Sequence, residues 1–67
     1  MTNRIREFRD LRSMRQRDLG AICDMDSTHI SRIENGHVDP TLTTAKKIAD
    51  ALEVTVEELF QLEGAAA

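Results

Sequence analysis

The stretch from Gln16 to Gly36, QRDLGAICDMDSTHISRIENG, decides the fold of this chain. It predicts two short helices, over residues 16–23 and 27–34, joined by a tight turn at Asp24-Met25. Gly36 ends the second helix, because glycine readily takes the left-handed backbone that helix ends need. The rest of the chain is expected to support this pair of helices.

Apolar side chains anchor both helices from one side. Leu19 faces inward from the first helix, and Ile30 and Ile33 fix the buried face of the second. Asp26 is expected to cap the second helix, with Met25 and Ile30 forming a hydrophobic staple across that cap.

Three further helices are expected, one before this pair and two after it. Asn3 can cap the first of these helices, which is expected to end near Ser13. Its inward positions are Ile5, Phe8 and either Leu11 or Arg12. Thr41 caps a later helix whose inward side chains are Leu42, Ala45, Ile48, Ala49 and Leu52.

A capping box formed by Thr55 and Glu58 begins a last helix that reaches about Gln61. The sequence therefore predicts an all-α, five-helix domain over residues 1–63, with residues 16–34 as its helix-turn-helix unit. Residues 64–67 are expected to be a short flexible tail.

The composition is that of an ordinary soluble globular domain. The chain has 67 residues, of which 40% are hydrophobic and 31% charged, and this fits one domain. No apolar run approaches the roughly 20 residues that span a bilayer, and no signal-peptide pattern opens the chain. We therefore expect a cytoplasmic protein without a membrane partner. The single Cys23 is expected to be a buried structural residue rather than a redox or metal-binding thiol.

The net charge of −3 looks unfavourable for binding a nucleic acid, but the charges are unevenly distributed. Residues 1–33 carry seven arginines against five acidic residues, whereas residues 34–67 carry two lysines against seven acidic residues. Halves of opposite sign are expected if one end of the molecule faces phosphate. So modest a basic surplus predicts weak non-specific affinity for DNA.

A polar arc on the helix over residues 27–34 is the candidate binding surface. At about 100° per residue, Ser27, Thr28 and Arg32 lie on the arc opposite Ile30 and Ile33. Such a helix can enter the major groove of DNA, where the hydroxyls and the Thr28 methyl contact base edges and Arg32 binds guanine. On the residues alone, the plain alternative is the solvated face of an amphipathic helix, which is the commoner case.

From Ile5 to Phe60 the chain resembles the phage-repressor and Cro-like helix-turn-helix proteins, the Xre family, with no gap between Gln16 and Gly36. The most diagnostic segments are residues 30–36, ISRIENG, and residues 54–60, VTVEELF. The resemblance implies a lambda-repressor-like DNA-binding domain and a sequence-specific transcriptional regulator, usually a homodimer on a palindromic operator. It favours base reading over plain solvation for the polar arc.

The resemblance also implies roles for individual residues. Ser27, Thr28 and Arg32 match the family's base-reading positions, and Arg9 and Glu34 match its structural ion pair. Gln16 matches a glutamine that holds a phosphate and braces the reading helix. The side chains expected at the DNA backbone are Gln16, Arg15, Arg17, Ser31, Asn35 and His37, with plain solvation as the alternative for Arg15 and Arg17.

Three positions depart from the family's pattern. Arg15 stands where relatives have serine or threonine, so the helix that follows lacks that side-chain cap. Asp24 and Glu53 stand where relatives have glycine, and neither residue takes a left-handed backbone as readily as glycine does. These changes are expected to cost stability more than they threaten function.

An apolar end formed by Leu59, Phe60 and Leu62 is expected to be the interface of a homodimer, since palindromic sites need two reading helices about 34 Å apart. The alternative is that Leu59 and Phe60 are ordinary core and only Leu62 is spare. Short terminal strands, involving Thr2 to Arg4 and Gln61 to Glu63, are expected to flank this end.

Other functions remain open at this point: an antitoxin or antirepressor-like protein-interaction module, or a controller protein of a restriction-modification system. An enzyme is not expected, because the chain lacks a glycine-rich phosphate loop and a serine-histidine-aspartate order with supporting turns, and His29 and His37 lack metal-ligand spacing. No cofactor or metal is expected. The expected partners are double-stranded DNA, a second copy of the chain and, under the interaction alternative, another protein.

Overall fold

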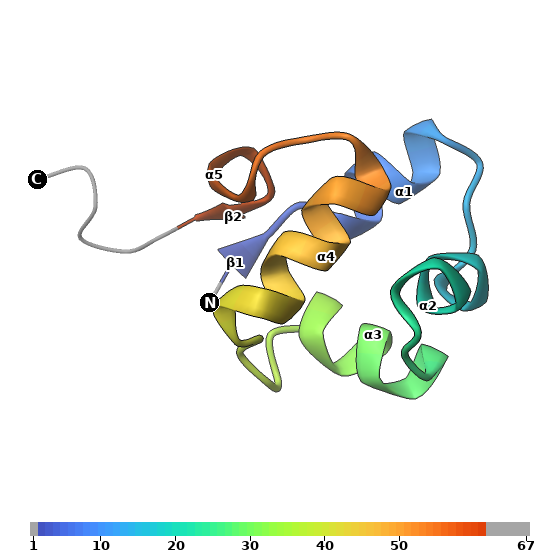
Figure 1. The fold of residues 1–67 in the computed structure, drawn as a ribbon, viewed down its shortest axis with the longest axis horizontal. Coiled ribbons are helices and arrows are strands. Elements are labelled where there is room, and N and C mark those ends of the chain that lie inside the picture. The colour runs from blue at the N-terminus through green and yellow to red at the C-terminus, as the bar shows by residue number, and fades with distance from the viewer. Residues whose placement is uncertain (1, 62–67) are drawn as a thin grey trace, which may run out of the picture.

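The computed structural model describes residues 2–61 of the chain. Its elements follow in the order β1 (Thr2–Asn3), α1 (Ile5–Leu11), α2 (Gln16–Cys23), α3 (Ser27–Glu34), α4 (Leu42–Leu52), α5 (Val56–Leu59) and β2 (Phe60–Gln61). The helix α4 crosses the middle of the molecule, with α2 and α3 below it and α5 above it (Figure 1). The all-α, five-helix fold predicted from the sequence is confirmed.

One apolar core joins all five helices and β2. Its buried side chains are Ile5, Leu19, Cys23, Ile30, Ile33, Ala45, Ile48, Ala49, Leu52, Leu59 and Phe60. The inward positions predicted for α2 and α3 are among them, and so are those predicted for α4 from Ala45 onward. Because each fully buried Leu or Ile stabilises the fold by about 1.5–3 kcal/mol, this core fixes the position of α3.

The starts of α4 and α5 are capped as predicted. The Thr41 hydroxyl accepts a hydrogen bond from the backbone N–H of Thr44 at 3.2 Å. At α5 the capping box is complete, since Thr55 and Glu58 each accept a hydrogen bond from the other's backbone N–H at 3.0 Å. These bonds satisfy N–H groups that the first turn of a helix leaves without partners.

The start of α3 differs from the prediction in one respect. Asp26 occupies the cap position with an extended backbone, but its side chain accepts no cap hydrogen bond. Met25 packs against the same core as Ile30, so apolar packing and not the carboxylate fixes how the chain enters α3.

The helix α1 is shorter than predicted. Ile5 is buried and Phe8 packs against the core as predicted, but the prediction for the end of the helix differs from the structure. The helix ends at Leu11, and Ser13 already has a left-handed backbone with φ of 51°. Leu11 and Arg12 are both exposed, whereas Arg9 is buried. The predicted inward position at Leu11 or Arg12 was therefore wrong; Arg9, which forms the ion pair described below, is the buried residue of this last turn.

Leu42 was also predicted to face inward, and this prediction was wrong, since 78% of its surface is exposed. Leu42 is the first residue of α4. Helical side chains tilt towards the N-terminus, so a residue at this position projects past the end of the helix. The buried stripe of α4 begins one turn later, at Ala45.

Short strands pair near the two termini. Thr2 lies opposite Gln61 and Asn3 opposite Phe60 in an antiparallel pair. The helix α5 ends at Leu59, two residues before the predicted end, because Phe60 has an extended backbone with φ of −116° and ψ of 135°. The predicted positions Leu62 and Glu63 and the predicted tail at 64–67 lie outside the described residues.

Leu59 and Phe60 do not form an exposed apolar end. They are 0% and 2% exposed within a single chain, where both belong to the core. The pairing of β1 with β2 turns the Phe60 segment back onto the molecule. The prediction that Leu59 and Phe60 line a dimer interface was wrong for this reason, and the alternative, ordinary core, is correct.

Candidate nucleic-acid interface

The turn between α2 and α3 is closed by contacts between Gly20 and Met25. The Met25 N–H donates a hydrogen bond to the Gly20 carbonyl oxygen at 2.7 Å, and Asp24 takes the left-handed backbone with φ of 57°. A Cβ on Gly20 would meet the Met25 carbonyl oxygen closer than real Cβ atoms approach other atoms. Glycine is therefore required here for α3 to pack across α2.

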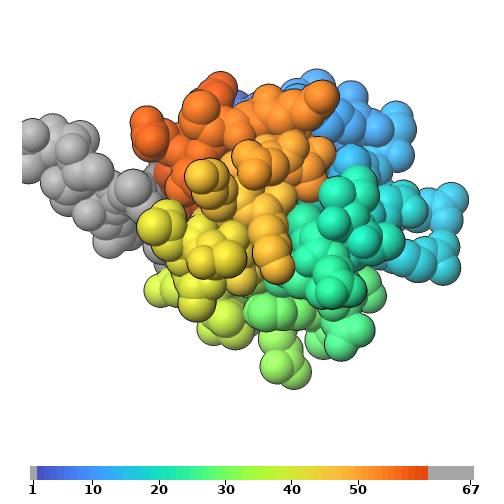
Figure 2. Space-filling model, in the orientation of Figure 1, coloured from blue at the N-terminus to red at the C-terminus, as the bar shows by residue number. Residues whose placement is uncertain are grey.

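The predicted reading side chains lie on the open face of α3. Ser27, Thr28 and Arg32 are exposed, while Ile30 and Ile33 on the opposite face are buried. Within residues 2–61, no hydrogen bond or ion pair engages these three exposed side chains. Figure 2 shows α3 at the lower edge of the molecule, flanked by α2 and by the loop that leads to α4.

A shallow hollow of about 270 Å³ lies beside these side chains. It is lined by Asp26, Thr28, His29, Arg32 and Val38. The sequence analysis did not single out Val38, which lies in the loop after α3 and is exposed. This loop therefore supplies an apolar side chain to the hollow that Arg32 lines.

The candidate phosphate-contacting residues do not all present free donors. Arg15, Arg17 and His37 are exposed. Asn35 is exposed too, but its amide nitrogen donates to the Ser31 carbonyl oxygen at 2.9 Å and lies 3.3 Å from the Ser31 hydroxyl. The predicted phosphate contact of Asn35 would require its side chain to turn away from Ser31.

The start of α2 has a cap that the sequence did not predict. Arg15 supplies no hydroxyl, but its backbone N–H donates a hydrogen bond to the Asp18 carboxylate at 3.0 Å. This contact provides half of a capping box, and the negative charge of Asp18 also suits the N-terminal end of a helix.

Glu34, the last residue of α3, ties three parts of the domain together. Its carboxylate accepts two hydrogen bonds from Arg9 of α1, at 3.0 and 3.1 Å, and one from the Gln16 amide at the start of α2, at 3.3 Å. The side chain is only 2% exposed. The same Arg9 donates to the Met14 carbonyl oxygen at 2.8 Å, so both ends of its guanidinium are held.

The protonation of this cluster follows from its contacts. Burial raises the pKa of Glu34, but the hydrogen bonds and charge of Arg9, with further hydrogen bonds from Gln16 and Arg6, outweigh it and leave this pKa below its usual value. The hydrogen bond to Glu34 raises the pKa of Arg9. Both groups are therefore charged at neutral pH, and Gln16 is fixed beside an ionised carboxylate.

Arg6 is a member of this cluster that the sequence analysis did not single out. Its Nε donates to the same Glu34 oxygen that Gln16 contacts, at 3.3 Å. The signal was present in the sequence, because Arg6 and Arg9 are three residues apart and so share one face of α1.

Two other kinds of feature are absent from residues 2–61. Residues 2–61 contain no cluster of three or more His, Cys, Asp or Glu side chains suited to a metal ion. No helix among them is long and apolar enough to cross a membrane. Cys23 is buried, and burial raises the pKa of its thiol.

Comparison with known proteins identifies related regulators. The chain is 35% identical over 63 residues to an uncharacterized HTH-type transcriptional regulator of Methanocaldococcus jannaschii, a match that covers 94% of this chain and 96% of that protein. It is 34% identical over 59 residues to the control protein C.MunI of a Mycoplasma species, covering 87% of this chain and 80% of that protein. It spans about half, 47%, of the HTH-type transcriptional regulator DdrOP3 of Deinococcus deserti.

A solved structure shares the fold. The restriction-modification controller protein C.AhdI from Aeromonas hydrophila superimposes with a TM-score of 0.80 at 30% identity, covering 85% of this chain and 86% of that one. Residues 5–59, from the start of α1 to the end of α5, match the protein family described as Helix-turn-helix. The chain therefore belongs to the Helix-turn-helix family of Xre and Cro-like proteins.

Proposed function

We propose that this protein is a sequence-specific DNA-binding transcriptional regulator that inserts the first turns of α3 into the major groove. Ser27 and Thr28 contact base edges through their hydroxyls, and Arg32 binds guanine O6 and N7. The observation that carries the proposal is the unpartnered, exposed state of these three side chains on a helix whose other face is buried. The HTH-type regulators among the relatives support it.

The proposed binding unit is a homodimer on a palindromic operator. Two copies related by a twofold axis place two α3 helices about one turn of DNA apart, roughly 34 Å. The short α3 supports this proposal, since one reading helix of eight residues contacts only a few base pairs and leaves specificity low.

Selection of binding sites from a random duplex pool tests the proposal. The wild-type chain should enrich a palindrome with half-sites about 10 base pairs apart. The Arg32→Ala variant should lose discrimination at one base pair of each half-site, by about 1–3 kcal/mol. Arg12→Ala is the matched control, because Arg12 is an exposed arginine beyond the end of α1 whose guanidinium lies against the Phe8 ring and donates to the Phe8 carbonyl oxygen, away from α3 in the sequence.

Two results would contradict the proposal. An unchanged base preference in Arg32→Ala would remove this residue from base reading, and no enrichment by the wild type would reject sequence-specific binding. Sedimentation of the protein with the enriched duplex should give two chains for each duplex, and one chain for each duplex would reject the dimer.

A second candidate is a controller protein of a restriction-modification system. The likeness to C.MunI and C.AhdI, which each match over at least 80% of their length, favours it. The enriched site would then occur upstream of restriction or modification genes next to the gene for this chain. Its absence from that region would reject this candidate and leave the more general one standing.

A further inference from the structure

Two arginines, Arg9 and Arg6, bind the Glu34 carboxylate unequally. Arg9 uses two nitrogens, at 3.0 and 3.1 Å, and is almost fully buried. Arg6 uses only its Nε, at 3.3 Å, and 65% of its side chain is exposed. A bidentate contact is the stronger arrangement, so Arg9 alone balances the charge of the carboxylate. Arg6 adds a second positive charge to a pair that is already complete.

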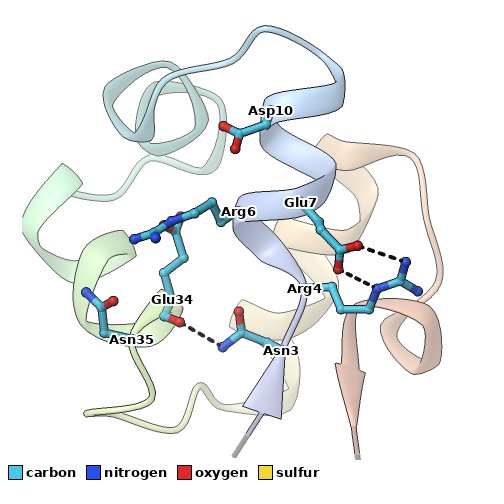
Figure 3. Close-up of a pocket in the computed structure, with 7 residues that line it drawn as sticks. All are labelled: Asn3, Arg4, Arg6, Glu7, Asp10, Glu34 and Asn35. Atoms are coloured by element: carbon cyan, nitrogen blue, oxygen red, sulfur yellow. Dashed lines mark hydrogen bonds and ion pairs between the residues drawn. The ribbon is translucent and has the colours of Figure 1, made fainter.

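The guanidinium of Arg6 keeps its binding capacity. Within residues 2–61 its two terminal nitrogens make no hydrogen bond, because the one contact to Glu34 is through Nε. A guanidinium can donate two parallel hydrogen bonds to a phosphate from one edge. Figure 3 shows the Arg6 side chain reaching from α1 across Glu34 towards α3, in a hollow that Asn35 also lines.

Glu34 places Arg6 next to Gln16. Both side chains donate to the same carboxylate oxygen, each at 3.3 Å, so their donor nitrogens are separated by no more than twice that distance. Gln16 is the residue that the family resemblance leads us to expect at a phosphate of the DNA backbone. A phosphate beside the Gln16 amide is therefore within reach of the Arg6 guanidinium.

The other two carboxylates of this hollow, those of Glu7 and Asp10, each lie close to a different arginine. Glu7 is paired with Arg4 at 2.8 Å. Asp10 is exposed, and its carboxylate lies 3.8 Å from the Nη1 nitrogen of Arg9. Arg6 and Gln16 instead contact Oε1 of Glu34, the oxygen that accepts from the Nη2 nitrogen of Arg9.

We propose that Arg6 is a further phosphate-binding residue. Glu34 holds Arg6 beside Gln16, so that both side chains contact the DNA backbone at the edge of the reading helix. This inference rests on the proposed function. Phosphate contacts fix the register of a protein on the duplex without reading sequence. Arg6 thus strengthens binding and adds no base preference.

Binding measured against salt concentration tests this role. Wild type, Arg6→Gln, Arg6→Lys and the control Arg12→Gln are titrated by fluorescence anisotropy against the enriched duplex and against a random-sequence duplex. Arg6→Gln should bind both duplexes more weakly by a similar factor, about fivefold for one exposed contact. The slope of log Kobs against log salt should fall by about 1, since one phosphate contact is lost.

These variants distinguish the loss of the Arg6 charge from a loss of folded structure. Arg6→Lys keeps the charge and should retain most of the wild-type slope. Arg12→Gln should keep both affinity and slope, and melting curves should show Arg6→Gln to be folded at the temperature of the assay. Base preference in the enriched site should be unchanged in Arg6→Gln, in contrast to Arg32→Ala.

A wild-type slope and affinity in Arg6→Gln would overturn the inference. If Gln16→Ala weakens binding in the same experiment, the proposed function stands and only the role of Arg6 fails. A wild-type protein that binds neither duplex, even at low salt, would overturn the proposed function and this inference with it.

Discussion

The guanidinium of Arg9 and the carboxylate of Glu34 form a two-point contact, at 3.0 and 3.1 Å, between residues that are 25 positions apart in the chain. Removing Arg9 leaves a carboxylate buried without its main counter-charge. We expect Arg9→Ala to lower the free energy of unfolding by about 3 kcal/mol. Thermal and urea unfolding should show this loss, and curves that overlay the wild type would contradict it.

A double variant serves as control for that prediction. Replacing the pair together, Arg9→Met with Glu34→Leu, removes both charges and leaves apolar groups of similar length. Because neither charge is then buried alone, the double variant should be more stable than Arg9→Ala. A double variant less stable than Arg9→Ala would mean that the loss has a cause other than an uncompensated charge.

The pH dependence of stability should also reveal Glu34. Burial raises its pKa, but Arg9, Gln16 and Arg6 outweigh burial, so the folded-state pKa lies below the usual value of 4.5. The unfolded chain then binds this proton more readily than the folded chain. The stabilisation is complete above the unfolded pKa and is lost as the pH falls through the folded pKa.

We therefore expect the melting midpoints of wild type and Glu34→Gln to differ at neutral pH and to converge in the acid range below 4.5. Circular dichroism melts at successive pH values measure both midpoints. A difference that stays constant down to acid pH would show that ionisation of Glu34 does not contribute.

Gly20→Ala should be destabilising although alanine is the better helix former. The added methyl group must displace the Met25 carbonyl oxygen, which belongs to the backbone of the turn. Overpacking of this kind costs about 1–3 kcal/mol, more than the gain in helix propensity of about 1 kcal/mol. Urea unfolding measures the net effect, with Ala21→Ser at the neighbouring exposed position as control. A Gly20→Ala variant more stable than the wild type would show that the backbone of the turn can shift to accommodate the added methyl group.

Glu53→Gly should stabilise the domain. Glu53 has a left-handed backbone with φ of 60° at the end of α4. Glycine adopts this backbone without the steric strain that a Cβ atom causes. We expect a gain of about 0.5–1 kcal/mol, and a smaller gain for Asp24→Gly, because aspartate tolerates this backbone better than glutamate. Glu57→Gly is the matched control: it makes the same replacement inside α5 and should cost about 1 kcal/mol. Equal effects at Glu53 and Glu57 in thermal melts would contradict the argument.

The sequence predicted best what depends on local chemistry. Both ends of α2 and of α3 fall at the predicted residues. The turn between the two helices and the glycine after α3 restrict the backbone dihedral angles there. The capping box at Thr55 and Glu58 formed for the same reason. In each case, residues a few positions apart determine the structure.

The predictions that failed depend on what surrounds a helix. Helical spacing allows Leu42 to face the core, yet no other element within residues 2–61 covers this side chain, which is 78% exposed. Leu59 and Phe60 are apolar enough for an interface, but the pairing of β1 with β2 places them inside the domain. Arg6 gained its place beside Gln16 only through Glu34, a contact across 28 residues that no short sequence window contains.

The separation of roles on α3 has a consequence for how such a protein changes over generations. The side chains proposed to read bases are exposed and make no hydrogen bond or ion pair within residues 2–61, whereas Ile30 and Ile33 are buried in the core and hold the helix in place. Exposed substitutions outside such contacts usually alter stability by less than about 0.5 kcal/mol. A descendant of this protein can therefore acquire a new target sequence by changing Ser27, Thr28 and Arg32 while inheriting the same scaffold intact.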